Sequence, residues 1–341
     1  MHRAFFDINI YWLCALTFAL AAFTCAVVTP LVRRMAFAVG VFDEPDDDRR
    51  VHTQPTPRLG GVAIFIGFML ALFAMLEVAL NNNFVIHHYL GTRDLAQIIG
   101  LLFGATLMLG VGLWDDIMGM RPQTKFLAQF LIALMMIVLY QFTILGFSLP
   151  RVGYVSLGLL AVPFSLFWYL GMVNAINFMD GLDGLVTGVA LIASVTMVIV
   201  SWWHHQYLVA ITMCALGGAA AGFLPFNYNP ARIFMGDGGS LFIGFVLASA
   251  AVMGTEKVAV GISLLVPLLV LALPIFDTAR VIVQRLGKRA PLFDADRSHM
   301  HHRLLDVGLS QRQVVNLIYL VCFVLGAIAI VLSRPGGPHV L

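Results

Sequence analysis

The chain is expected to form an all-α, polytopic transmembrane bundle of about ten helices. Of its 341 residues, 60% are hydrophobic and only 11% are charged, whereas soluble domains are roughly 45–50% apolar and about 25% charged. The apolar residues gather in ten runs of about 20 residues, the length that a hydrocarbon core of about 30 Å requires. Because these runs lack the alternation of a membrane barrel strand, helix is the expected spanning state.

The expected spans cover residues 8–28, 60–80, 95–114, 126–145, 154–173, 185–203, 206–224, 239–255, 258–283 and 313–333. The first run is longer than the core of a signal peptide and has no small-residue cleavage site, so it is taken as a span. Pro267 and Pro274 lie inside the ninth run, where a kink or break is predicted. The whole chain, 1–341, is interpreted as a single integral membrane domain.

Orientation follows from the distribution of Lys and Arg. The first, third, seventh and ninth connections hold fifteen of the twenty basic residues, which puts the odd-numbered connections in the cytoplasm and both termini outside. Fourteen of the eighteen acidic residues lie on the same side, and this bias is not explained by the orientation rule. We therefore expect the active site in a cytoplasmic cleft formed by segments 29–59, 114–125, 174–184, 225–239 and 284–312.

Composition excludes other classes of site. The net charge of +2 gives no case for nucleic-acid binding. The four cysteines lack metal or redox spacing and are interpreted as buried thiols; they are Cys14, Cys25, Cys214 and Cys322.

Two segments offer carboxylates at membrane boundaries. Asp115 and Asp116 end an apolar run, where adjacent carboxylates are costly unless a cation or proton relieves their repulsion; a solvated helix cap is the simpler alternative. If residues 174–183 are helical, Asn177, Asp180 and Asp183 share one broad face. Three oxygen-bearing side chains without a basic neighbour suit a hard cation such as Mg²⁺.

A third segment, Gly236 to Ser240, reads Gly-Asp-Gly-Gly-Ser before the eighth run. Its Gly238 and Ser240 offer backbone N–H groups and a helix N-terminus for phosphate oxygens, and Asp237 can hold a metal that bridges them. An ordinary loop explains the glycines about as well. Asp277 in the ninth run is a further acidic residue, with a structural arginine partner as likely as a catalytic role.

Histidines and arginines supply the remaining polar groups. His299, His301 and His302 lie beside Arg303, and the absence of nearby cysteine with flanking arginines disfavours zinc and favours a diphosphate and a nucleobase. His52 and Arg58 lie in a proline-rich connection that faces anionic ligands or lipid headgroups, although charge orientation alone also explains it.

The co-location of these segments is more specific than any one of them. Five separate connections bring carboxylates, an asparagine, glycine-rich backbone, histidines and arginines to one face, which is the equipment of metal-assisted phosphoryl transfer. An ion-coupled secondary transporter is the alternative from another class, but its site would lie near the midplane between repeated halves. A CDP-alcohol phosphotransferase would carry a different aspartate pattern, which this chain lacks.

PTPRLGG, WDD, NAINFMDGLDGL, FMGDGGS and DRSHMHHR resemble, in this order, the signatures of the polyprenyl-phosphate N-acetylhexosamine-1-phosphate transferases. The resemblance covers roughly residues 30–312. It implies transfer of a sugar-1-phosphate from a UDP-sugar to undecaprenyl phosphate, with release of UMP, in the bacterial cytoplasmic membrane. The product would be the first lipid-linked sugar of a cell-surface polymer.

The resemblance also implies residue roles. Asp115 and Asp116 would lie at the acceptor phosphate, one of them as its base, and Asp180 and Asp183 would line the metal and diphosphate site with Asn177. Asp237 would be the principal ligand of Mg²⁺, for which Mn²⁺ is an expected substitute. The segment that would contact the UDP-sugar comprises His299, His301, His302 and Arg303.

Two branches of the family compete. Phospho-N-acetylmuramoyl-pentapeptide transferases typically carry a lysine before TPTMGG and three consecutive histidines, whereas this chain has PTPRLGG and His-Met-His-His-Arg. The chain is more similar to the branch that uses UDP-N-acetylglucosamine for O-antigen, common-antigen or teichoic-acid linkage. Some relatives continue to an eleventh span, and a homodimer is an assembly that the sequence allows. Direct attack on the β-phosphate is the preferred mechanism, with an aspartyl-phosphate intermediate as the rival.

Overall fold

The computed structural model describes residues 10–43, 55–81, 92–149, 153–254, 267–288 and 300–334. In these residues, nine helices are long and apolar enough to cross a membrane. They coincide at least in part with nine of the ten predicted runs. The ninth predicted run, 258–283, lies partly outside the described residues, so its first half is not tested.

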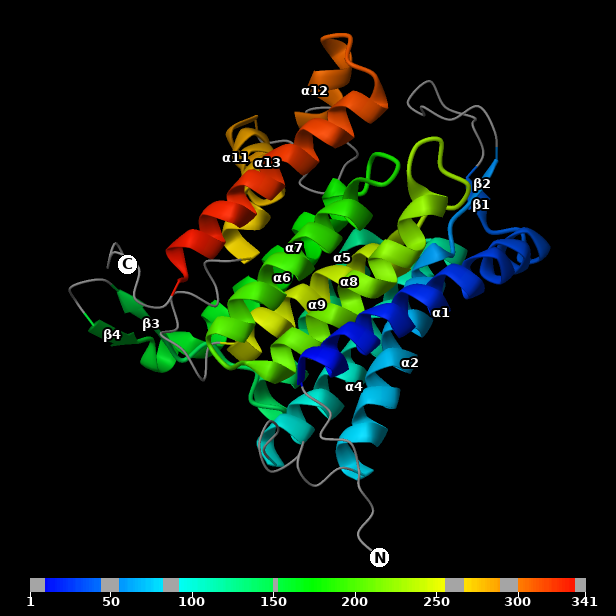
Figure 1. Ribbon diagram of the computed structural model, residues 1–341. Helices are drawn as coiled ribbons and strands as arrows, with labels where there is room; N and C mark the ends of the chain where they lie inside the picture. The colour runs from blue at the N-terminus through cyan, green and yellow to red at the C-terminus, as the bar shows by residue number, and fades with distance from the viewer. Residues whose placement is uncertain are drawn as a thin grey trace, which may run out of the picture.

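The long helices form one bundle (Figure 1). They are α1 (Ile10–Val39), α2 (Gly60–Asn81), α4 (Thr92–Met118), α5 (Pro122–Leu139), α6 (Ala161–Met179), α7 (Leu185–Trp203), α8 (Tyr207–Asn227), α9 (Gly236–Gly254) and α13 (Gln311–Leu332). Two further helices, α11 (Ala272–Lys288) and α12 (Met300–Asp306), lie beside α13 along one side of the bundle. A helical stretch at 267–270 ends at Leu271 before α11 begins, which confirms the predicted break.

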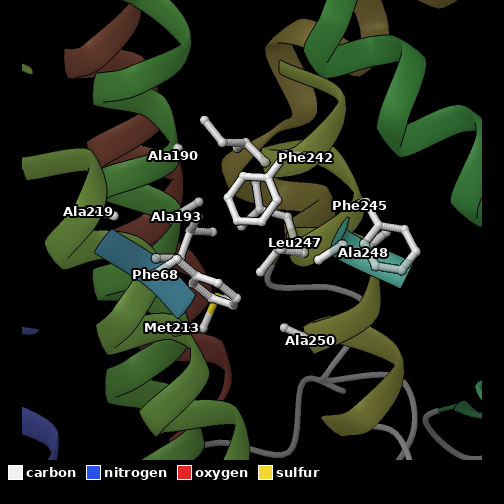
Figure 2. Close-up of a cluster of buried hydrophobic side chains, with 14 of the residues drawn as sticks. Phe68, Ala190, Ala193, Met213, Ala219, Phe242, Phe245, Leu247, Ala248 and Ala250 are labelled. Carbon is white, nitrogen blue, oxygen red and sulfur yellow. The ribbon is translucent and has the colours of Figure 1, made fainter. Parts of the chain in front are cut away.

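The centre of the bundle is α9, in which every residue from Gly238 to Gly254 is buried. A helix that is apolar all round has no face suited to water or headgroups and belongs in the interior. Figure 2 shows Phe242 of α9 beside Phe68 of α2, whereas Phe245 lies apart from the labelled side chains of α2, α7 and α8; its ring centroid is 5.7 Å from that of Tyr169 on α6. The rings of Phe68 and Phe242 meet edge to face with centroids 5.3 Å apart, a favourable aromatic arrangement. The start of α9 is thereby held in place for the site.

Three boundaries differ from the expectation. Helix α1 continues past Pro30 to Val39, into the predicted loop 29–59. Residues 174–179 are the last turns of α6 rather than a connection. An antiparallel hairpin of β3 (Gly146–Leu149) and β4 (Gly153–Ser156), followed by the short helix η1 (Gly158–Leu160), stands where the fifth predicted run begins. The fold is therefore almost wholly α-helical, with small hairpins at its ends.

The second small sheet pairs β1 (Phe42–Asp43) with β2 (Thr56–Pro57). It lies at the end of the bundle that also carries α12 (Figure 1). Because β2 leads directly into α2, this pairing brings the PTPRLGG segment to the helix ends that carry the carboxylates.

Candidate active site

Four helix ends meet at the predicted site. Asp115 and Asp116 lie in the last turn of α4, and Lys125 lies in the first turn of α5. Asn177 is near the end of α6, where Asp180 is the capping residue, and Asp237 is in the first turn of α9. The structure thus brings together residues that are separated by up to 122 positions in the chain.

Glycines allow this close approach. A Cβ added at Gly112 of α4 would lie 2.4 Å from the Asp237 carbonyl oxygen and the Gly238 Cα. Gly236, which begins α9, has φ +70°, and a Cβ there would lie 2.3 Å from the Arg58 carbonyl oxygen. Only glycine combines that backbone conformation with so close a contact.

Backbone hydrogen bonds join the PTPRLGG and FMGDGGS segments. The N–H groups of Gly60 and Gly61 donate to the carbonyls of Phe234 and Met235 at 2.9 and 2.8 Å, and Phe234 N–H donates to Pro57 at 2.8 Å. Between these bonds, the half-exposed Arg58 side chain forms an ion pair with Asp43 of β1. The two glycine-containing motifs therefore form one structural unit at the site.

Asp116 caps α9. Its Oδ1 and Oδ2 accept hydrogen bonds from the backbone N–H groups of Asp237 and Gly238, each at 2.9 Å. A carboxylate is favoured at a helix N-terminus, where N–H groups lack intrahelical partners and the helix dipole is positive. The expectation that the Gly238 N–H is free for a phosphate does not agree with this geometry, because Asp116 takes it.

Lys125 lies between the carboxylates of two helices. Its Nζ is 2.8 Å from Oδ2 of Asp115 and 3.0 Å from Oδ2 of Asp237, and it donates to Oδ1 of Asn177 at 3.4 Å. Lys125 is among the basic residues that predict the orientation of the chain, and its contact with the carboxylates was not predicted. The signal was present, since two facing carboxylates need a counter-ion and Lys125 follows the Trp-Asp-Asp motif within ten residues.

Asn177 connects the end of α6 to α9. Its Nδ2 donates to Oδ1 of Asp237 and to the buried Ser240 hydroxyl, the latter at 2.8 Å. Ser240 in turn lies within reach of the Gly236 carbonyl, at 3.3 Å. Ser240 thus orients Asn177, whereas direct substrate binding by Ser240 stays a prediction.

Asp180 shows that negative charge accumulates here. Its pKa is raised well above the ordinary value, first by removal from water and then by the carboxylates of Asp237, Asp116 and Asp183, which outweigh the opposite effect of Arg58. Like charges in a partly dry site favour the protonated form. A divalent cation would relieve the same repulsion.

Asp183 departs from the predicted helical face. Helix α6 ends at Met179, so Asp183 lies in the following turn and is 2% exposed. Its Oδ2 accepts hydrogen bonds from the Asn229 Nδ2 and the Ala231 N–H, at 3.0 and 2.9 Å. The shared face of Asn177, Asp180 and Asp183 is conditional on a helix through residue 183, and that condition is not met because α6 ends at Met179.

The histidine segment is described only in part. His52 and His299 lie outside the described residues, and so do the side chains of His301 and His302, although the backbone of these last two belongs to α12. Arg303 on the same helix is exposed. Asp277 forms an ion pair with Arg280 at 3.0 Å, as one of its two predicted roles required.

The donor set fits a hard cation in its chemistry. Oxygen atoms of Asp115, Asp180, Asp237 and Asn177 gather where Lys125 is the paired cation, and Mg²⁺ prefers such ligands. Within the described residues, no three Asp, Glu, His or Cys side chains form a metal site by themselves.

Comparison with known proteins agrees with the motifs. The pattern of glycosyl transferase family 4 matches residues 98–255. The Bacillus subtilis (strain 168) protein named "Probable undecaprenyl-phosphate N-acetylglucosaminyl 1-phosphate transferase" is 34% identical over 317 residues, covering 93% of this chain and 84% of that protein. The Mycobacterium tuberculosis (strain ATCC 25618 / H37Rv) decaprenyl-phosphate N-acetylglucosaminephosphotransferase is 33% identical over 328 residues, covering 89% and 79%.

A relative from the other branch is also similar. The phospho-N-acetylmuramoyl-pentapeptide-transferase of Staphylococcus saprophyticus is 28% identical over 345 residues, covering 94% of this chain and 98% of that protein. Identity above 30% across most of the chain, together with the family pattern over residues 98–255, decides the assignment. The chain is therefore a multi-pass membrane protein of glycosyl transferase family 4, the family of the polyprenyl-phosphate N-acetylhexosamine-1-phosphate transferases.

Proposed function

We propose that this transferase moves N-acetylglucosamine-1-phosphate, or a related amino-sugar-1-phosphate, from a UDP-sugar to undecaprenyl phosphate. UMP is the second product, and the lipid-linked sugar starts a cell-surface polysaccharide such as O-antigen or a teichoic-acid linkage unit. The site faces the cytoplasm of the bacterial inner membrane, where UDP-sugars are made. Support comes from N-acetylglucosamine-phosphate transferases among the relatives, such as those of Bacillus subtilis and Mycobacterium tuberculosis, and from the bias of Lys and Arg to this face.

The observation that carries the proposal is the contact of Lys125 with both Asp115 and Asp237. It joins the ends of α4, α5 and α9 into one charged centre at a membrane boundary. A reaction between a phosphate monoester and a diphosphate needs its partners held together against their mutual repulsion. A centre that combines carboxylates with an ammonium group supplies binding sites for both a metal and a phosphate oxygen.

Asp237 and Asn177 are the residues that would hold Mg²⁺, with Mn²⁺ as a substitute. When bound, the ion supplies charge neutralisation at the diphosphate of the donor. Asp116 is committed to the N–H groups that start α9, so its role is to fix Asp237 in place. Lys125 balances the charge of Asp115, and its ammonium group donates hydrogen bonds to a phosphate oxygen of the substrates.

The reaction needs little help from a general base. A phosphate monoester has its second pKa near 6, so the acceptor is mostly a dianion at neutral pH. One of its oxygens forms a bond to the β-phosphorus of the UDP-sugar, and the bond from that phosphorus to the oxygen shared with the α-phosphate breaks. The electron pair leaves with UMP. Asp115 then serves to position Lys125 and the acceptor, and no covalent aspartyl intermediate is required.

The alternative is phospho-N-acetylmuramoyl-pentapeptide transfer, as in the Staphylococcus saprophyticus relative. It uses the same phosphorus chemistry with a larger donor. The His-Met-His-His-Arg sequence of this chain favours the N-acetylglucosamine branch.

The test is to incubate purified protein with undecaprenyl phosphate, Mg²⁺ and a panel of UDP-sugars, and to measure UMP release and the lipid product by mass spectrometry. We expect release with UDP-N-acetylglucosamine, loss on chelation with EDTA, and recovery on adding Mn²⁺. Release only with UDP-N-acetylmuramoyl-pentapeptide would establish the alternative. Activity that survives EDTA would overturn the metal-dependent form of the proposal.

A further inference from the structure

Asp183 is built into a contact between two loops. Its carboxylate accepts hydrogen bonds from the Asn229 side chain and from the Ala231 backbone, so it joins the turn after α6 to the segment that precedes α9. Carboxylates that accept two such bonds are held in one orientation, and charge-assisted bonds are stronger than neutral ones.

Asn229 extends this contact to α13. The same Nδ2 donates to Oε1 of Gln311 at 2.6 Å, and the Asn229 carbonyl accepts from Nε of Arg312 at 2.9 Å. One turn further along α13, Asn316 accepts from the Tyr228 hydroxyl at 2.9 Å. The first two turns of α13 are thus fixed to the loop that Asp183 holds.

A compact turn connects the fixed start of α13 to the end of α12. The N–H groups of Val307 and Gly308 donate to carbonyls of α12, at 3.2 and 2.9 Å. Gly308 has φ +97°, and Ser310 begins α13 with a capping box. Leu304 and Leu305 of α12 pack against the hydrophobic core. Since only residues 307–310 separate the two helices, fixing the start of α13 fixes the end of α12.

The start of α12 is held from a different helix. Oδ1 of Asp277, on α11, accepts the backbone N–H of Met300 at 2.9 Å, and it also pairs with Arg280. Asp277 is only 7% exposed. Figure 1 shows α11, α12 and α13 lying together on one side of the bundle. The helix that carries His301, His302 and Arg303 is therefore held by a buried carboxylate directly at its start, and its end is linked through Asn229 and the start of α13 to a second one, Asp183.

We infer that Asp183 and Asp277 are positioning residues that hold the histidine-bearing helix α12 at its two ends and so present it to the UDP-sugar. The inference rests on the proposed function for the role of that helix in donor binding. It gives Asp183 a positioning role in place of the predicted catalytic one, and it adds a positioning role to the pairing of Asp277 with Arg280. Donor affinity, rather than the chemical step, is what the two carboxylates control.

The kinetic test compares Asp183→Asn and Asp277→Asn with wild type. Asparagine keeps one acceptor oxygen in each place and removes the charge. We expect the KM for UDP-N-acetylglucosamine to rise about tenfold in each variant, a loss equal to one charge-assisted hydrogen bond. The kcat, the KM for undecaprenyl phosphate and the Mg²⁺ concentration at half-maximal rate should change by less than about twofold. A fall in kcat with unchanged donor KM would make Asp183 catalytic and overturn the inference.

Two further variants keep the test decisive. Asn229→Ala removes the uncharged partner of Asp183 and should raise the donor KM similarly, and combining it with Asp183→Asn should add little, because both break one connection. If the two substitutions had fully additive effects on the donor KM, Asp183 and Asn229 would not act through one connection. Asp306→Asn removes an exposed carboxylate from α12 itself and should leave all constants unchanged.

A readout independent of transfer separates this inference from the proposed function. Hydrogen–deuterium exchange at residues 300–306 should quicken in Asp183→Asn and Asp277→Asn and stay unchanged in Asp306→Asn. If exchange is faster in the two variants but the wild-type protein has no activity with any UDP-sugar, the positioning of α12 by Asp183 and Asp277 is upheld and the proposed function is overturned. If the wild-type protein transfers the sugar-phosphate, and exchange and donor KM are unchanged in the two variants, only the positioning role of Asp183 and Asp277 is overturned. Should Asp183→Asn fail to fold, Asn229→Ala and Asp277→Asn decide the same question.

Discussion

The carboxylate centre and the histidine-bearing side of the molecule are built in different ways. Around Asp237, helix ends approach so closely that a methyl group at Gly112 would contact the backbone of α9 at 2.4 Å. Around α12, side-chain hydrogen bonds such as those of Asp183 and Asp277 fix the positions of the helix and of the segments next to it. The first region adds close backbone packing, which resists displacement, to its polar contacts. The second has the packing of Leu304 and Leu305 but relies more on a few polar contacts that a single substitution removes.

This difference matches the two tasks of a phosphoryl transferase. Reacting groups have to be held within a fraction of an ångström, which dense packing achieves. A helix that binds a donor has to admit the donor and release UMP, which a region held by polar contacts can do. Substitutions in the first region should therefore act on kcat, and those in the second on donor KM.

The largest expected effect is at Asp237. Asp237→Asn keeps the shape of the side chain and removes the charge that faces Lys125 and would hold Mg²⁺. We expect kcat to fall by about 10³-fold, equivalent to several kcal/mol of transition-state stabilisation. Product formation is measured by UMP release at saturating substrates. A fall of less than about tenfold would remove Asp237 as the metal ligand.

Lys125 tests whether the ammonium group is part of the reacting centre. Lys125→Met keeps the length of the side chain and leaves Asp115 and Asp237 without their shared cation. We expect kcat to fall by about 10²-fold, while the Mg²⁺ concentration at half-maximal rate decreases because a competing cation is gone. Arg121→Met, in the exposed residue before α5, is the matched control. Equal losses of kcat at both positions would mean that catalysis needs only positive charge near this end of α5, and not the contact of Lys125 with Asp115 and Asp237.

Much of the centre was predictable from the sequence, and the missing parts have physical reasons. Helix lengths and the residues at helix ends follow from hydropathy, so the meeting of Asp115, Asp116 and Asp237 at one face could be anticipated. The partner of each carboxylate could not. Asp116 caps α9, and Asp183 bonds to the loop before α9 from a turn, because α6 stops at Met179 and no periodicity indicates that.

The hairpin of β3 and β4 was missed for a related reason. Most of β4 (Gly153–Ser156) is apolar enough to be included in the fifth predicted run, and β3 (Gly146–Leu149) falls in a predicted connection too short to show a strand pattern. The contacts of α12 were also inaccessible, since Asp277 and Met300 are 23 positions apart and their hydrogen bond uses a backbone group that every residue has.

Gly112 measures how much the chemistry depends on close packing. Gly112→Ala adds a Cβ that cannot fit without moving α9 away from α4, so we expect kcat to fall by roughly tenfold to a hundredfold and thermal stability to decrease, with donor KM nearly unchanged. Gly110→Ala lies on the same helix with open space around the added Cβ and should be neutral or slightly stabilising. Similar losses in both variants would show that helix backbone, and not the contact with α9, determines the effect.

The smallest effect, and the one that isolates the charge of the centre, concerns Asp180. Because the pKa of this carboxyl is raised in the folded protein, the folded state retains a proton that the unfolded chain releases near pH 3.9. Stability without metal must then fall as the pH rises from about 4 through the raised pKa. Asp180→Asn removes this dependence. At pH 8 in EDTA, its Tm should exceed that of wild type by about 2 °C, and the two should agree more closely at pH 5. Adding Mg²⁺ should raise the wild-type Tm more than that of the variant, because the ion relieves a repulsion that asparagine lacks. A variant less stable than wild type at pH 8 would mean that positive groups already compensate the Asp180 carboxylate, and that the centre does not carry an excess of negative charge.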